Sequence, residues 1–397
     1  MYSEQCYKLG SNRSAIRELF EYGKQRAAIV GKENVYDFSL GNPTIPAPAC
    51  VKEAIVEILE TTSSMEVHGY TSAQGDAELR AALAEYYNNT YGTKFHADNY
   101  YITCGAAASL CISFRALTES KEDEFIAIAP FFPEYRVFVE GNGAKLRVVK
   151  PETENFQINM KELEAAINEH TKGVIINSPN NPSGVVYSEE TIKELAALLT
   201  MKSKELGHTI FLISDEPYRE IVYDDVEVPY VTKYYANTIV CYSYSKSLSL
   251  PGERIGFVLV PDEVTDSRNV YYAMCGAARA LGFVCAPSMF QKVLIKCLGQ
   301  VGDISLYKTN RDILYKGLTE LGFECVKPEG AFYLWMKSPV ANEEEFVAAG
   351  KKYHILMVKG SAFGCAGYVR LAYCVSYEMI ERSLSAFEKL AKDYNLS

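Results

Sequence analysis

Lys246 stands in a segment rich in hydroxyl groups, residues 242–248 (Tyr-Ser-Tyr-Ser-Lys-Ser-Leu), and Arg254 follows eight positions later. A second cation near a lysine can lower the pKa of its amine and so favour the uncharged, nucleophilic form. Together the two cations would attract an anionic group such as a phosphate. On its own this pattern also fits a surface lysine, and the rest of the chain decides between the two interpretations.

Polar residues also follow two other apolar runs. Residues 177–184 (Asn-Ser-Pro-Asn-Asn-Pro-Ser-Gly) come after one run, and residues 214–218 (Ser-Asp-Glu-Pro-Tyr) close the next. In open α/β sheets, ligands bind beyond the carboxyl ends of the strands. Amides, two carboxylates and a phenol would therefore gather at one edge, although a plain turn and a structural salt bridge would account for the same residues without a ligand.

The elements that must position these residues can be read from alternating patterns. Runs rich in β-branched and aromatic residues predict strands, and apolar residues at helical spacing between them predict helices. This alternation predicts an α/β fold with a mostly parallel, seven-stranded sheet flanked by helices. The predicted strands are residues 100–103, 124–129, 145–149, 173–177, 209–214, 238–243 and 255–260, and the clearest helices between them are residues 106–117, 160–167 and 189–206.

The chain has 397 residues, more than one hydrophobic core usually supports, so we expect a large domain and a smaller one. The pattern changes after Pro287, where a long helical stretch to about residue 321 is followed by a smaller α+β pattern. We expect an N-terminal segment (1–44) that joins the small domain, a large domain (45–286) that opens on a helix at 47–59, and a small domain (287–397). Within the small domain we expect strands at 331–336 and 368–373 and a closing helix at 376–393.

Composition excludes several functional classes. The net charge of −10 comes from acidic residues spread along the chain, which argues against a nucleic-acid partner. No apolar stretch is long enough to cross a bilayer, and the first ten residues lack the features of a secretion signal, so we expect no membrane partner and a cytoplasmic location. The eleven cysteines are scattered singly with no CxxC pair, so we expect reduced thiols and no metal site.

Taken together and in order, the motifs resemble a known family. Residues 181–184 (Asn-Pro-Ser-Gly), 215–218 (Asp-Glu-Pro-Tyr), 243–246 (Ser-Tyr-Ser-Lys) and 254–256 (Arg-Ile-Gly) stand in the order and approximate spacing of the class I and II aminotransferases of pyridoxal-phosphate fold type I. The resemblance extends over almost the whole chain, from residues 39–43 to residues 369–371. It implies an enzyme that moves an amino group between an L-amino acid and a 2-oxo acid by a ping-pong mechanism, with pyridoxal 5′-phosphate as cofactor.

The resemblance also implies a role for each matching residue at the cofactor ring. Lys246 would hold the cofactor as a Schiff base and later move a proton on the substrate. Asp215 would pair with the pyridinium nitrogen, an interaction of about 4 kcal/mol at about 4 Å and an effective dielectric near 20. Asn181 and Tyr218 would hydrogen-bond the phenolic oxygen, and Phe132 would stack on the ring.

Further matches concern the phosphate and the substrate. The phosphate-binding residues would be Arg254, Ser243, Ser245 and the backbone N–H groups of Gly105, Ala106 and Ala107 at the start of a helix. Tyr70 matches a tyrosine that reaches the phosphate of the neighbouring subunit, which would make the active unit a homodimer with shared active sites.

For the substrate, Arg370 would hold the α-carboxylate in a bidentate fork, and Gly41 would contact the same group, with domain closure bringing the two together. Some relatives use a second arginine from the partner subunit to bind a side-chain carboxylate. Arg279 lies in the right region but does not match that motif closely. The sequence therefore leaves the side-chain specificity undecided.

Three other readings compete with transamination. A pyridoxal-phosphate lyase, for example one that eliminates from a cysteine conjugate, would use the same Lys246, Asp215 and Arg370. A non-catalytic effector-binding module would need an added DNA-binding domain, for which there is no room before Gly41. A dinucleotide enzyme would need a GxGxxG motif after a predicted strand, and we find none.

Overall fold

A computed structural model describes residues 2–11 and 15–396, and these residues form two compact units. Unit 1 comprises the described residues up to Thr44, the short segment Asn181–Val185, and the described residues from Ser305 onward. Unit 2 comprises Ile45–Asn180 and Val186–Ile304. No helix of the described part is both long enough and apolar enough to span a bilayer.

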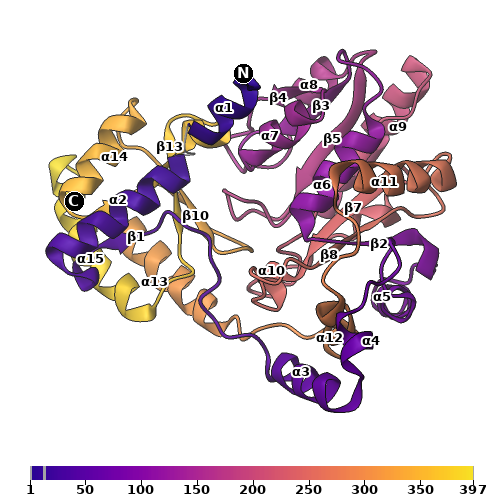
Figure 1. Ribbon diagram of the computed structural model, residues 1–397. Helices are drawn as coiled ribbons and strands as arrows, with labels where there is room; N and C mark the ends of the chain where they lie inside the picture. Colours follow the sequence, from indigo (N-terminus) through magenta and orange to yellow (C-terminus); the bar gives the residue numbers. More distant parts are fainter. Residues whose placement is uncertain (1, 12–14, 397) are drawn as a thin grey trace. The chain divides into compact units, whose positions relative to one another are not determined.

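The core of unit 2 is a seven-stranded sheet in the order β2-β8-β7-β6-β5-β3-β4 (Figure 1). Strand β8 runs antiparallel to its neighbours β2 and β7, and the other pairs are parallel. The mostly parallel sheet is therefore confirmed. The strands are β2 (Tyr100–Thr103), β3 (Glu124–Ile128), β4 (Lys145–Val149), β5 (Thr171–Asn177), β6 (Phe211–Asp215), β7 (Thr238–Ser243) and β8 (Gly256–Leu259).

Helices cover both faces of this sheet, which is why its strands, except the edge strand β4, are largely buried on both sides. On one face, α6 (Ala106–Leu117), α7 (Glu134–Gly141) and α11 (Ser267–Leu281) pack on residues such as Phe125 and Ile213. On the other face, α8 (Met160–Ala166) and α9 (Glu189–Leu206) pack on Ile126 and Leu212. A third cluster joins β2, β7 and β8 to the helices α3 (Ala49–Thr61), α5 (Ala77–Tyr91) and α12 (Ser288–Cys297).

The long helical stretch expected between 287 and 321 is in fact two helices. Helix α12 ends at Cys297, because Gly299 adopts φ 76° just beyond it. Helix α13 (Ser305–Glu320) begins eight positions after Cys297. Helix α12 belongs to unit 2, since its buried Val293 and Leu294 pack in the same cluster as α3 and α5. Unit 2 therefore continues to Ile304, beyond the boundary expected at 286.

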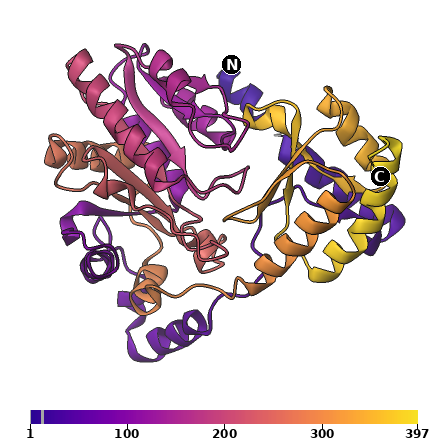
Figure 2. The same ribbon diagram turned by 180° about the vertical axis from the view of Figure 1, so that it is seen from behind.

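Unit 1 contains a four-stranded antiparallel sheet and a two-stranded parallel one. The larger sheet has the order β12-β13-β10-β9, and the smaller pairs β1 with β11. Helices α13 and α15 lie side by side against them, as Figures 1 and 2 show. The remaining elements are β1 (Tyr36–Asp37), β9 (Cys325–Val326), β10 (Tyr333–Lys337), β11 (Ile355–Leu356), β12 (Val358–Lys359), β13 (Tyr368–Ala372), α1 (Glu4–Ser11), α2 (Ala15–Val30), α14 (Glu343–Lys352) and α15 (Tyr377–Asp393).

The segment Asn181–Val185 belongs to unit 1, although it lies between two stretches of unit 2 in the sequence. The carbonyl oxygen of Gly184 accepts hydrogen bonds from the backbone N–H groups of Glu329 and Gly330, both at 2.9 Å. A Cβ at position 184 would lie 2.7 Å from a side-chain atom of Pro328. Glycine at this position thus lets the segment approach the 328–330 turn closely enough to bond to it.

We expect Gly256→Ala to destabilise the protein by roughly 3 kcal/mol, because the added Cβ would overlap the carbonyl oxygen of Tyr242 across the β7–β8 pair. The measurement is the midpoint of thermal unfolding. Gly276→Ala is the matched control, since this glycine lies inside α11 with open space around its Cβ position. The control should be neutral or slightly stabilising, and equal losses in both variants would contradict the expectation.

Candidate active site

A buried carboxylate ends the central strand β6 of unit 2. Asp215 is 4% exposed, and its Oδ2 accepts a hydrogen bond from Tyr135 Oη at 2.6 Å. Asn177, at the end of the neighbouring β5, donates from Nδ2 to the Asp215 backbone oxygen at 2.9 Å. The other carboxylate oxygen, Oδ1, is buried and has no hydrogen-bond partner among the described residues.

This environment perturbs the acid strongly. The pKa of Asp215 is raised to about 7, chiefly because the carboxyl is buried; the hydrogen bond from Tyr135 partly opposes this rise, and the nearby charge of Glu216 adds to it. A buried acceptor without a partner is costly. A ligand that brings a positively charged N–H donor to Oδ1 would remove that cost, and a pyridinium ring is such a ligand.

Hydroxyl groups, a guanidinium and a helix N-terminus meet beside β7 and β8. The hydroxyls of Ser243 and Ser245 lie 2.7 Å apart, and Arg254 donates from Nη1 to Ser245 Oγ at 3.5 Å. Gly105 caps the N-terminus of α6 with φ 85°, and a Cβ there would lie 3.0 Å from Arg254 Nη2 and 3.4 Å from Ser243 Oγ.

Glycine at position 105 thus keeps open the space between the helix N-terminus and the guanidinium. The free N–H groups of the first turn of α6, which begins with Ala106 and Ala107, are natural donors to an anion. The chemistry of this donor set fits a phosphate.

Lys246 lies in the short helix α10 (Tyr244–Ser247), which follows β7 directly. The side chains on either side of it, Ser245 and Ser247, are buried, which fixes the turn. Ser247 Oγ lies 3.0 Å from Tyr242 Oη, and the Ser247 backbone oxygen accepts from the N–H of Gly302 at 2.8 Å. Lys246 is therefore carried by a rigid turn at the carboxyl end of a central strand.

Glu216, the second carboxylate of this segment, has a structural role. Arg219 donates from Nε to Glu216 Oε2 at 2.6 Å, and both side chains are buried. Arg219 also donates to the carbonyl oxygens of Val228 and Pro229, each at 3.1 Å, and lies against the ring of Tyr230 at 4.9 Å. The salt-bridge interpretation is therefore correct for Glu216.

Two aromatic residues expected in the site lie in the same unit. Phe132 packs edge-to-face on Tyr135, with ring centroids 5.7 Å apart, and so reaches the residue that holds Asp215. Tyr218 is buried three positions after Asp215. The sequence analysis did not identify Tyr135 as a site residue, and its hydrogen bond to Asp215 comes from the structure alone.

The second group of expected residues lies in unit 1 around Arg370. This buried guanidinium, on β13, donates from Nη1 to Asn181 Oδ1 at 3.0 Å and from Nη2 to the Ser39 backbone oxygen at 2.5 Å. Its Cζ lies 4.6 Å from the ring of Tyr333 and 4.8 Å from that of Phe363. Arg370 is therefore held in one orientation by hydrogen bonds and aromatic rings.

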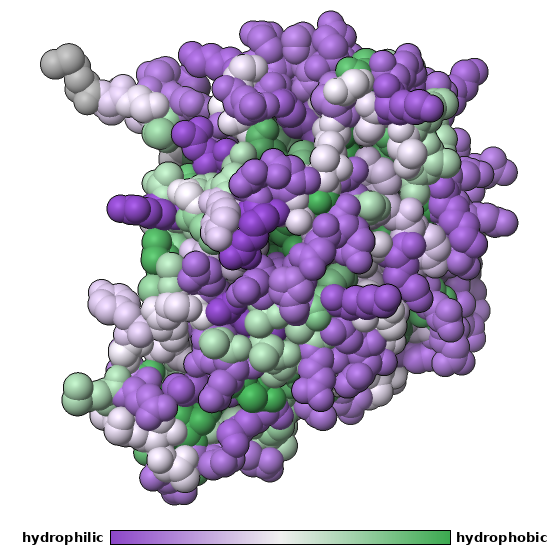
Figure 3. All heavy atoms as spheres, turned by 90° about the vertical axis from the view of Figure 1, so that its right-hand side faces the viewer, coloured by the Kyte–Doolittle hydropathy of each residue, from purple (hydrophilic) through white to green (hydrophobic). Residues whose placement is uncertain are grey.

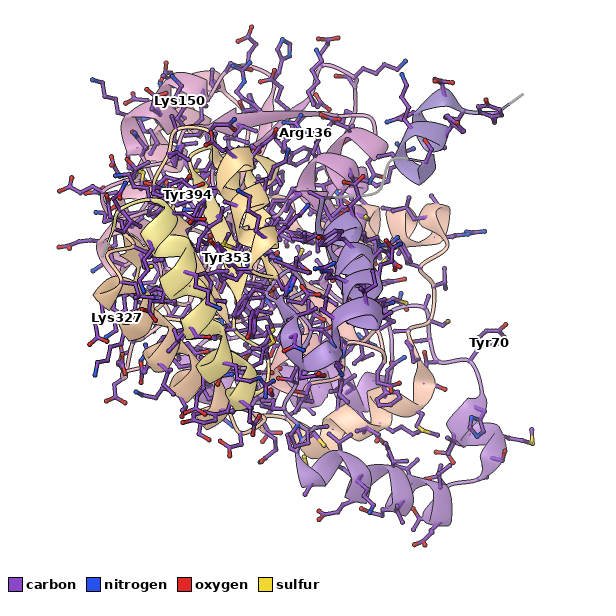
Figure 4. All side chains as sticks on the ribbon, turned by 90° about the vertical axis from the view of Figure 1, so that its left-hand side faces the viewer. Tyr70, Arg136, Lys150, Lys327, Tyr353 and Tyr394 are labelled. Carbon is purple, nitrogen blue, oxygen red and sulfur yellow. The ribbon has the colours of Figure 1, made fainter. Side chains whose placement is uncertain are left out.

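The remaining expected residues have different surroundings. Gly41 lies in unit 1 beside Tyr333, whose hydroxyl occupies the space that a Cβ at position 41 would need. Tyr70, in unit 2, is 99% exposed and points away from the chain (Figure 4). Arg279 is exposed on α11. Sequence reasoning missed Ser39, whose contact to Arg370 comes from its backbone oxygen and leaves no signal in the residue type.

Comparison with known proteins identifies the family to which this chain belongs. The family described as aminotransferase class I and II matches residues 33–387. The chain belongs to this family. An aminotransferase of solved structure from Eubacterium rectale is 63% identical, with a TM-score of 0.98 over 100% of this chain and 99% of that one.

Curated relatives are more distant and carry different substrate names. A probable aspartate aminotransferase from Methanocaldococcus jannaschii is 29% identical over 98% of this chain and 100% of its own length. An aromatic-amino-acid aminotransferase from Thermococcus litoralis is 28% identical over 97% of each chain. Family membership therefore does not by itself define the substrate side chain.

This aminotransferase has fold type I and depends on pyridoxal phosphate, as expected from the sequence. It transfers an amino group between an amino acid and a 2-oxo acid, and the lyase alternative is not favoured. When bound, the cofactor supplies a carbonyl carbon that takes up the amino group and a ring that withdraws electrons from the reacting carbon.

We expect the cofactor-free aminotransferase to lose stability as the pH rises from about 4 to about 7, because over this range folded Asp215 keeps a proton that unfolded Asp215, with its ordinary pKa of 3.8, has released. The full shift corresponds to on the order of 4 kcal/mol. The measurement is the unfolding midpoint at pH 5 and pH 8, compared with Asp215→Asn, which lacks this titration. A pH response of the same size in the variant would contradict the assignment.

Proposed function

We propose that this aminotransferase carries pyridoxal phosphate on Lys246 and uses the freed amine of that lysine to move the proton during amino transfer. The observation that carries the proposal is the buried carboxylate of Asp215, whose Oδ1 has no hydrogen-bond partner among the described residues. Because that oxygen suits a protonated ring nitrogen, it supports placing the ring at the end of β6. Lys246 belongs to the turn that follows the adjacent strand β7.

The other groups of unit 2 support a position for each part of the cofactor. We propose that the phosphate binds at the N-terminus of α6 and that the ring face lies against Phe132. Tyr218 would donate to the phenolic oxygen and so hold the cofactor in register with Lys246. The groups proposed for the phosphate are Arg254, Ser243, Ser245 and the backbone N–H groups of Gly105, Ala106 and Ala107.

For the substrate, we propose that Arg370 binds the α-carboxylate. Its guanidinium is planar, and the two hydrogen bonds to Asn181 and Ser39 fix the direction in which its remaining N–H groups point. Asn181 would thus orient Arg370, in addition to the cofactor contact that the family resemblance implies. Gly41 would contact the same carboxylate through its backbone. The Tyr333 hydroxyl leaves no space for a side chain at position 41.

We expect Lys246→Ala to abolish amino transfer, because no other group would both anchor the cofactor and move the proton. The variant should still bind some cofactor through the phosphate groups. The measurement combines turnover with the visible absorption band of the purified protein. Lys202→Ala, which removes a half-buried lysine paired with Glu205 on α9, is the control and should keep both. Turnover at the wild-type rate in Lys246→Ala would refute the proposal.

A cytoplasmic location stays a prediction.

We further propose a homodimer in which Tyr70 completes the phosphate site of the partner subunit. Tyr70 supports the dimer because a side chain 99% exposed makes little contact within its own chain. Val56, Leu59 and Met65, which precede it on α3 and α4 (Ser64–His68), are also exposed. Figure 3 shows one face of the molecule, which is mostly hydrophilic with scattered hydrophobic areas.

Mixing two variants, each impaired on its own, would test the shared site. Tyr70→Ala should lower turnover alone, and Lys246→Ala should abolish it. If subunits exchange, a hybrid dimer holds one site with both native residues, so an equal mixture should recover about a quarter of wild-type turnover per subunit above the contribution of Tyr70→Ala. Subunit exchange is checked by native mass measurement. Hybrid dimers without recovered turnover would contradict sharing through Tyr70.

A further inference from the structure

A second carboxylate, Asp37, connects to Arg370 through one residue of unit 1. Asp37 Oδ1 accepts hydrogen bonds from the backbone N–H of Ser39 at 2.9 Å and from Ser39 Oγ at 2.6 Å. The Ser39 backbone oxygen then accepts from Arg370 Nη2 at 2.5 Å. Ser39 is fully buried. Asp37 therefore holds the residue whose backbone oxygen accepts the hydrogen bond from the guanidinium.

The position of Asp37 is itself fixed by its neighbours. It ends β1, where it pairs with Leu356 of β11. On the other side α2 approaches so closely that a Cβ on its buried Gly23 would lie 2.9 Å from Asp37 Oδ2. The following residue, Phe38, accepts a hydrogen bond from the N–H of Ala372 just beyond Arg370, at 2.9 Å. The segment carrying Asp37 is thus attached to the end of the strand that carries Arg370.

We propose that Asp37 is a positioning residue for carboxylate recognition, acting on Arg370 through Ser39. The inference rests on the proposed role of Arg370 and adds a residue that does not touch the substrate. The two hydrogen bonds that Asp37 accepts from Ser39 hold this residue with its carbonyl group directed at Arg370 Nη2. A guanidinium held in this way has a defined orientation, which the two-pronged binding of a carboxylate requires.

The other charged groups near Asp37 provide a control. Asp37 lines a cavity of about 660 Å³ together with Lys24 of α2, Lys32 and Glu33 of the following turn, and Arg382 of α15. Glu33 shares this cavity, and its side chain accepts a hydrogen bond from Asn34, not from Ser39. Removing Glu33 therefore changes the charge of the cavity without touching the connection to Arg370.

The experiment compares Asp37→Ala, Asp37→Asn, Glu33→Ala and Arg370→Ala in the holoenzyme. The amino donor is L-aspartate or L-phenylalanine, whichever the wild type uses faster. KM and kcat are measured for each variant. The fluorescence of Trp335 is followed as donor is added, because this tryptophan is the only one in the chain, pairs with Arg370 in the sheet, and packs edge-to-face on Phe363 at 5.7 Å.

We expect Asp37→Ala to raise KM about tenfold with kcat changed less than twofold, and to shift the fluorescence titration by the same factor. Asp37→Asn keeps an oxygen that can accept from Ser39 and should recover most of the loss. Glu33→Ala should match the wild type. In the Arg370→Ala background, Asp37→Ala should add no further rise in KM.

Other results would overturn the inference. One is a folded Asp37→Ala variant whose KM is unchanged, although Arg370→Ala raises KM. This result would exclude Asp37 as a positioning residue and leave the proposed role of Arg370 intact. Another is an equal rise in Glu33→Ala, which would indicate an effect of cavity charge. A loss of kcat with an altered visible band would place the effect at the cofactor. If Arg370→Ala itself leaves KM unchanged, the proposed function of Arg370 fails first and this inference falls with it.

Discussion

A carboxylate buried at the end of the central strand is the constraint on which the rest of unit 2 depends. Moving a charge away from water is costly, and a buried Asp215 is tolerable only if it is neutral or if a cation meets it. The fold supplies a phenol to one oxygen, from Tyr135, and leaves the other oxygen buried. The site is thus prepared for a positively charged partner.

The surrounding groups keep that carboxylate in place. A second buried carboxylate, Glu216, lies next to Asp215 and would increase the cost of burying negative charge. Its ion pair with Arg219 offsets that charge. Arg219 is in turn held by two carbonyl oxygens and the ring of Tyr230, so the loop after β6 has little freedom. Preorganisation of this kind means that little rearrangement is needed when the cofactor binds.

Much of this could be predicted from the sequence because the relevant signals are local. All the strands of the large sheet except the edge strand β4 are largely buried on both faces, so their apolar runs are nearly continuous, and Asp215 and Lys246 lie at or just after the ends of such runs. The bond between Tyr135 and Asp215 joins residues 80 positions apart, which no local pattern reveals. The same holds for Ser39, which acts through its backbone, and for the segment Asn181–Val185, which two backbone hydrogen bonds join to unit 1.

The pairing of β1 with β11 has a consequence for the order in which the protein folds. Tyr36 pairs with Ile355, so the first strand of the chain has no partner until almost the whole polypeptide has been synthesised. The strands of the large sheet, by contrast, are complete once Leu259 has emerged. Closing so long a loop is entropically costly and contacts of this kind form slowly. We therefore expect the surroundings of Asp215 and Lys246 to fold first. The surroundings of Arg370, which would bind the carboxylate, should fold last.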